Sequence, residues 1–81
     1  MTLSVRLFAR ARDLAGAAVV TVEMPAGATA GDLRRRLAAA HPALAPLLGR
    51  SALAVDNEFA GDDRVLSRGA EIALLPPVSG G

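Results

Sequence analysis

Several residue types are missing or rare in this 81-residue chain, and each absence removes a class of function. There is no cysteine, so neither a disulfide framework nor a thiolate metal site can form. His41 is the only histidine, which leaves too few parts for a histidine metal cluster or a Ser-His-Asp triad. There is also no lysine, which excludes Schiff-base and P-loop chemistry and any internal ε-amino acceptor for an acyl group. We therefore predict no metal site on this chain.

Long apolar segments and an excess of charge of either sign are also missing. No apolar run approaches the roughly 18 residues that a membrane-spanning helix requires, and the N-terminus shows no signal-peptide pattern. The formal net charge is +1, from nine arginines and eight acidic residues. Such a near-neutral balance disfavours binding to nucleic acids by bulk electrostatics. We expect a cytoplasmic protein that binds neither membranes nor nucleic acids.

The length of the chain allows one small domain. A chain of this size buries only about 60–65% of the surface that its unfolded form exposes. It can hold one core but no deep, enclosed active site. Much of the 52% hydrophobic content is alanine, and only two aromatic residues, Phe8 and Phe59, are present.

Two segments near the N-terminus alternate between apolar and other residues, which is typical of half-buried strands. In the first, residues 2–9, the two faces carry Leu3, Val5 and Leu7 on one side and Ser4, Arg6 and Phe8 on the other. The second covers residues 19–24, and the link between the two contains Gly16 as a breaker. The pair predicts a hairpin with a longer than minimal loop.

Residues 29–42 carry the start and stop signals of a helix. Thr29 suits the N-cap, with Asp32 three residues later as a variant of the capping box, and Pro42 ends the helix at or before the preceding residue. The apolar face is predicted to carry Leu33, Leu37 and Ala40. The arginines at positions 34–36 wrap around the helix, so we interpret them as solvated.

The second half of the chain predicts short strands and turns. Residues 51–55 and 58–60 are predicted to form strands joined by a turn at Asp56 and Asn57, and residues 70–76 to form the last strand. Gly69 is expected to adopt a positive φ before that strand. Apolar residues outside the strands are predicted to pack into the core: Leu44, Leu47 and Leu48 before the third strand, and Val65 and Leu66 before the last.

This order of elements predicts an α+β fold in which one main helix packs on one face of a small mixed sheet. The first and last strands are the most apolar and should be central neighbours. If they run parallel, Phe8 and Leu75 face away from the helix at the end of the sheet where the chain leaves it. Phe8 then either caps the core or belongs to a patch that binds a partner.

The chain ends in "PPVSGG", residues 76–81, which we interpret as a projecting tail behind a domain of residues 1–75. Pro76 and Pro77 favour extended backbone and hold the chain off the domain. After them come the apolar Val78 and the small Ser79, then two residues without side chains, Gly80 and Gly81, which fit a slot too narrow for other residues.

The only reactive group that such a tail presents is the α-carboxylate of Gly81. A carboxylate does not react as an electrophile near neutral pH unless it is activated, for instance by adenylation. The chain has no nucleotide-binding loop, so a separate enzyme would have to perform that step.

Three stretches carry a resemblance to a known family: "LFARARDLAG" at residues 7–16, "LAVDNE" at 53–58 and "EIALLPPVSGG" at 71–81. With them, essentially the whole chain resembles the small, sulfur-carrying subunit of molybdopterin synthase, which has the ubiquitin-like β-grasp fold. Two turns depart from the family pattern. The family commonly has asparagine where Asp56 stands, and Asp-Gly-Asp-Glu where this chain has residues 68–71.

The resemblance implies a cycle in which an activating enzyme adenylates the Gly81 carboxylate with ATP and a sulfur source converts it to a thiocarboxylate. The carrier then inserts its tail into the large synthase subunit, which holds the catalytic acids and bases, and its sulfur goes to a cyclic pyranopterin precursor. Two carriers on a large-subunit dimer would form a heterotetramer. This chain itself would bind no cofactor. By matched position, the partner-binding residues would be Phe8, Arg12, Leu75, Pro76, Pro77, Val78, Ser79 and Gly80.

Three alternatives remain open from the sequence. The chain could carry sulfur for another pathway, such as thiamin thiazole synthesis, cysteine synthesis or tRNA thiolation, with the same terminal chemistry. It could be a ubiquitin-like modifier that is joined through Gly81 to lysines of target proteins. It could also be a β-grasp interaction module with an inert tail.

Overall fold

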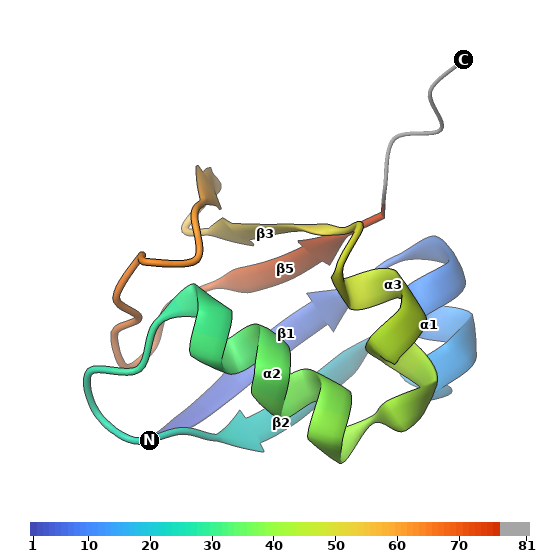
Figure 1. Cartoon of the computed structure of the whole chain (residues 1–81), viewed down its shortest axis with the longest axis horizontal. Coiled ribbons are helices and arrows are strands. Elements are labelled where there is room, and N and C mark those ends of the chain that lie inside the picture. Colours follow the sequence, from blue (N-terminus) through green and yellow to red (C-terminus); the bar gives the residue numbers. More distant parts are fainter. Residues whose placement is uncertain (77–81) are drawn as a thin grey trace.

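The computed structural model describes residues 1–76, which form a five-stranded mixed sheet with helices on one face (Figure 1). The strands lie in the order β2-β1-β5-β3-β4. The elements follow one another as β1 (Thr2–Leu7), α1 (Ala9–Ala15), β2 (Val19–Glu23), α2 (Ala30–Ala40), η1 (Pro42–Leu44), α3 (Ala45–Leu48), β3 (Ala52–Val55), β4 (Glu58–Ala60) and β5 (Ile72–Leu75). This arrangement confirms the predicted α+β class and the β-grasp fold.

The first and last strands, β1 and β5, are neighbours at the centre of the sheet, as predicted, and they run parallel. β1 also pairs with β2 as an antiparallel hairpin, and β5 pairs on its other side with β3. In the register of the central pair, Val5 lies opposite Ile72 and Leu7 opposite Leu74. Because β1 and β5 run parallel, their C-terminal ends reach the same edge of the molecule.

α2 crosses one face of the sheet and closes the core beneath it (Figure 1). Its N-terminus has the predicted capping box: the Asp32 backbone N–H donates to the Thr29 hydroxyl, and the Thr29 N–H donates to the Asp32 carboxylate. Leu33 and Leu37 are fully buried. The prediction for the end of the inner face was wrong, because Ala40, in the last helical position, is exposed.

The link between β1 and β2 was predicted as a breaker-containing connection, and it contains the short helix α1. Ala11 is its one buried residue and Ala15 is partly buried against the core, so two small alanines hold the helix in place and no large apolar residues at helical spacing reveal it. Alanine, arginine and leucine all have high helix propensity, which accounts for the helix. The breaker works as a C-cap, since Gly16 is left-handed and its N–H donates to the Arg12 carbonyl.

The close approach of α2 to the loop before β5 explains a glycine in its first turn. The Gly31 N–H donates to the Asp62 carbonyl at 2.9 Å. A Cβ at this position would lie 3.1 Å from both that oxygen and the Asp62 Cβ, which is tighter than most real contacts. The helix therefore keeps a residue of low propensity because the loop packs directly against its backbone.

Two predictions about side chains in this region were wrong. Arg34 is not solvated: it is half-buried, and its guanidinium donates to the carbonyls of Leu48 and Ser51 and pairs with Asp62. Arg34 thereby ties α2 to the segment that enters β3. Val65 was expected to be buried beside Leu66, but only Leu66 is buried and Val65 is 59% exposed.

The second half of the chain otherwise follows the prediction. Asp56 and Asn57, both with positive φ, connect β3 to the edge strand β4, and Gly69 has the expected positive φ. The apolar segment before β3 folds into η1 and α3, and it buries Leu44, Leu47 and Leu48.

Candidate functional site

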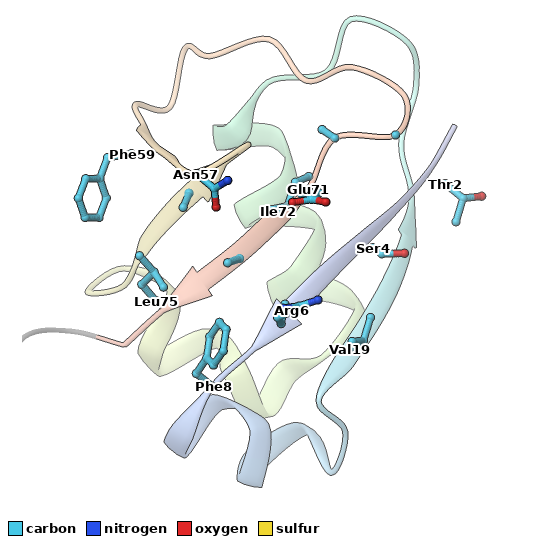
Figure 2. A pocket seen from close by; sticks show the side chains of 14 residues that line it. Thr2, Ser4, Arg6, Phe8, Val19, Asn57, Phe59, Glu71, Ile72 and Leu75 are labelled. Carbon is cyan, nitrogen blue, oxygen red and sulfur yellow. The ribbon is translucent and has the colours of Figure 1, made fainter.

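The face of the sheet opposite α2 is not covered by any described element, and its side chains form a groove (Figure 2). The register of the strands places one row of residues straight across this face. From β2 to β4 the row consists of Val19, Arg6, Ala73, Ala54 and Phe59. The two alanines form a low floor between taller side chains, which makes the face concave.

The groove has a volume of about 630 Å³ and gathers both aromatic residues of the chain. Phe59 is 79% exposed and Val19 is 49% exposed. Val19 on β2 and Phe59 on β4 stand at opposite ends of the row, so exposed apolar side chains border the groove on both sides. Apolar groups that line one groove fit the surface of a partner. Phe59 was not among the predicted site residues, although its pairing position opposite Ala54 assigns it to this face. The one feature of the sequence that could have pointed to Phe59 is that it is one of only two aromatic residues.

Phe8 and Leu75 lie together at the end of the groove where β5 ends (Figure 2). Phe8 is 38% exposed and precedes α1 as its N-cap residue, and Leu75 is half-buried. Both therefore face away from α2, as the alternation of the strands predicted. Phe8 does not belong to the buried core cluster, which favours the interpretation as part of a binding patch.

The backbone next to Phe8 is in an unfavourable conformation. Ala9 has a φ of 49°, in the left-handed region that residues with a Cβ rarely adopt. Strained backbone of this kind is found where the surrounding structure holds a functional side chain in place. Here the turn at Ala9 directs the chain from β1 into α1 and leaves the ring of Phe8 on the open face.

Pro76 and Arg12 do not line this groove. Pro76 is exposed and lies at a second, smaller hollow between α1 and α3, together with Arg10, Leu14 and Arg50. Arg12 is exposed in the last turn of α1. The structure therefore brings together Phe8 and Leu75 of the predicted partner-binding residues and leaves Arg12 and Pro76 outside the groove.

The remaining predicted site residues, Pro77, Val78, Ser79, Gly80 and Gly81, lie outside the described residues. Their roles, and the division into a domain of residues 1–75 and a tail of residues 76–81, stay predictions. The structure places Leu75 and Pro76, from which these residues continue.

The ion pairs of the described residues lie away from the groove floor. Arg34 pairs with Asp62, Arg64 with Glu58, and Arg35 with Asp32. Hydrogen bonds from the backbone and side chain of Thr29, with a smaller effect of the Arg35 guanidinium, hold the pKa of the Asp32 carboxyl below its usual value of 3.8. These interactions serve the fold.

Within residues 1–76, no three histidine or acidic side chains gather in a way that could hold a metal ion. Across the same residues, no helix combines the length and apolarity needed to cross a membrane.

The fold and the open groove define a small β-grasp domain that presents an apolar face beside the root of its C-terminal residues. The ThiS family model matches residues 5–81, and the chain belongs to this family. Among its relatives is the molybdopterin synthase sulfur carrier subunit of Chlamydomonas reinhardtii, which is 37% identical over all of both chains.

Two solved structures extend the comparison. The crystal structure of SAMP1 from Haloferax volcanii superimposes with a TM-score of 0.87 at 32% identity and covers all of both chains. A chain in the protein–protein complex of subunits 1 and 2 of the molybdopterin-converting factor from Helicobacter pylori matches with a TM-score of 0.70 at 26% identity, again over all of both chains.

Proposed function

We propose that this chain is the sulfur-carrier subunit of a molybdopterin synthase and delivers sulfur as a thiocarboxylate on Gly81. The observation that carries the proposal is the open groove, which contains both aromatic residues and reaches the root of the Gly-Gly sequence. A face of this kind fits docking to a larger subunit. The relatives named as sulfur carrier subunits and the subunit 1 and 2 complex from Helicobacter pylori support this assignment.

The proposed chemistry begins at the terminal carboxylate. One carboxylate oxygen of Gly81 attacks the α-phosphorus of ATP on a separate activating enzyme, and pyrophosphate leaves. A hydrosulfide equivalent then displaces AMP from the acyl adenylate and leaves a thiocarboxylate. ATP is thus a substrate of the activating enzyme, and this chain binds no cofactor itself.

Transfer takes place on the large subunit. The thiocarboxylate sulfur attacks an electrophilic carbon of the cyclic pyranopterin precursor, and the carbon–oxygen bond at that carbon breaks as the oxygen group leaves. Water then hydrolyses the bond between the acyl carbon and sulfur. The carboxylate is regenerated, and the sulfur remains on the precursor. Because the dithiolene needs two sulfur atoms, two carriers serve one product, in keeping with a heterotetramer of two carriers on a large-subunit dimer.

Reconstitution tests the proposal. The chain is incubated with an activating enzyme, ATP and a sulfide donor, and intact mass spectrometry should show the gain expected for exchange of one oxygen for sulfur. The loaded chain, mixed with a large subunit and the precursor, should yield molybdopterin. No mass gain under conditions that load a known carrier would refute the carrier role, and loading without product would leave a carrier for another thiolation pathway.

Deletion of Gly81 provides the matched control. The variant should lose loading and sulfur transfer completely, while its melting temperature stays close to that of the wild type, because the buried core is formed by residues 3–74. A large fall in melting temperature would show that the terminal residues stabilise the fold instead.

A second function, protein modification, is favoured by one observation. The small archaeal modifier protein 1 of Haloferax volcanii is 37% identical over 94% of this chain and 97% of its own length. In this case the Gly81 carboxyl would form an isopeptide bond with a lysine of a target protein. A tagged chain expressed in a host with its own activating enzyme would then appear in covalent adducts that survive denaturation and reducing agents and disappear on deletion of Gly81.

A further inference from the structure

Arg6 stands in the middle of the open face. It lies between Val19 of β2 and Ala73 of β5 in the row across the sheet. The nearest residues in sequence that also line the groove are Ser4 on β1 and Phe8, just after β1 (Figure 2). Arg6 is the only cationic residue in the lining of the groove.

No acidic group of the described residues pairs with Arg6 within ion-pair distance. Glu71 is the only acidic residue in the lining of the groove. Glu71 directly precedes β5. Extension of the register places it beside Ser4, two residues along the strand from the position opposite Arg6. The backbone N–H of Glu71 donates a hydrogen bond to the Asp56 carboxylate at 2.9 Å. In the free domain, water is therefore left to solvate the guanidinium of Arg6.

Docking of a partner onto the groove would remove that water. A guanidinium that is buried without an acceptor costs several kcal/mol, which can cancel most of the gain from covering the apolar residues around it. A long side chain at the rim of an interface can turn outward to solvent. The Arg6 side chain has less freedom to turn out of the groove into solvent. Its strand, β1, lies between β2 and β5, and Phe8 lies beside it toward the end of the groove.

We propose that the partner of the open face presents a carboxylate to Arg6, and that this ion pair selects the partner. The inference rests on the proposed function, since it assigns a chemistry to the docking face of the large subunit. An apolar groove alone would accept many apolar surfaces, whereas a central charge rejects every surface that leaves it unpaired. The occupant of the groove is therefore an apolar protein surface with one acidic residue near its centre.

The test measures binding of the intact chain to its large subunit by titration calorimetry. Arg6→Gln removes the charge, and Arg6→Glu reverses it. We expect a loss of affinity of at least roughly 30-fold for Arg6→Gln and a larger loss for Arg6→Glu. Arg36→Glu is the matched control, because Arg36 is an exposed residue of α2 on the opposite face of the sheet, and it should bind like the wild type. Equal affinity of all four proteins would overturn the inference.

Two further arms identify the acceptor. If Arg6 turned to Glu71 on docking, Glu71→Gln would weaken binding as much as Arg6→Gln does, and the partner carboxylate would be refuted. If the inference holds, Glu71→Gln binds normally, and one acidic residue of the large subunit, changed to arginine, restores the affinity of Arg6→Glu. Unaltered melting temperatures of the variants establish that folding is not the cause.

Failure of this inference is distinguishable from failure of the proposed function. A wild-type chain that neither binds the large subunit nor yields product would refute the proposed function. A wild-type chain that binds and yields product, with Arg6 variants that do the same, would refute only the role of Arg6.

Discussion

Replacement of Phe59 by alanine should separate binding at the open groove from stability of the fold. Phe59 is 79% exposed on a three-residue edge strand, so only about a fifth of it is buried within the domain. Full burial of a phenylalanine side chain contributes about 1.5–3 kcal/mol, so the loss in the free energy of unfolding should be roughly 0.3–0.6 kcal/mol. The remaining four fifths are available to a partner.

If docking covers that surface, the same scale assigns it about 1.2–2.4 kcal/mol, which corresponds to a loss of roughly 7- to 50-fold in affinity for the large subunit. Urea unfolding followed by circular dichroism measures the first quantity, and titration calorimetry measures the second. Val65→Ala is the matched control, because Val65 is also a large exposed apolar residue and does not line the groove. It should leave the affinity unchanged.

Two outcomes would refute this reasoning. Undiminished affinity of Phe59→Ala would show that the groove is not the docking face or that the partner stops short of β4. A fall in the free energy of unfolding by about 3 kcal/mol or more, the usual cost of truncating a core phenylalanine, would show that the ring belongs to the core.

Three further predictions concern the fold. Ala9→Gly should raise the free energy of unfolding by roughly 1 kcal/mol, because glycine relieves the left-handed strain; a loss of stability in urea unfolding would contradict that strain. Arg34→Ala should lower the free energy of unfolding by about 1–3 kcal/mol, because the carbonyls of Leu48 and Ser51 lose their donor. The exposed control Arg36→Ala should change the free energy of unfolding by less than about 0.5 kcal/mol. The pKa of Asp32 is lowered in the folded protein, so its stabilising effect is present above the unfolded pKa and is lost as the pH falls through the folded pKa. The difference in stability between the wild type and Asp32→Asn should therefore shrink below about pH 4, and a difference that stays constant from neutral to strongly acidic pH would contradict this cause.

The strands and the main helix could be predicted because their signals are local. Alternation in β1 and β5 is set by residues two positions apart, and the capping box of α2 by residues three apart. The central position of β1 and β5 followed from their apolar character alone. Phe8 and Leu75 could be placed on the open face because each strand fixes the side to which every second residue points.

The features that the sequence did not reveal depend on contacts between distant segments. Arg34 looks like its exposed neighbours in a run of three arginines, and only the approach of the segment before β3 gives it carbonyl acceptors. Val65 looks like a core residue beside Leu66, yet it forms an isolated bridge with Thr29 and its side chain stays outside the core. The site residue Phe59 was overlooked because its face is determined by pairing with β3.

The parallel pairing of β1 and β5 has a mechanical consequence for a chain that is gripped by its end. A pull on the residues after Leu75 runs along β5, which is held on one side by β1 and on the other by β3. The hydrogen bonds to both neighbours lie across the direction of the force, so they are loaded together in shear and are not peeled apart one by one. The sheet is therefore expected to stay intact under a force that acts on β5 from its C-terminal end.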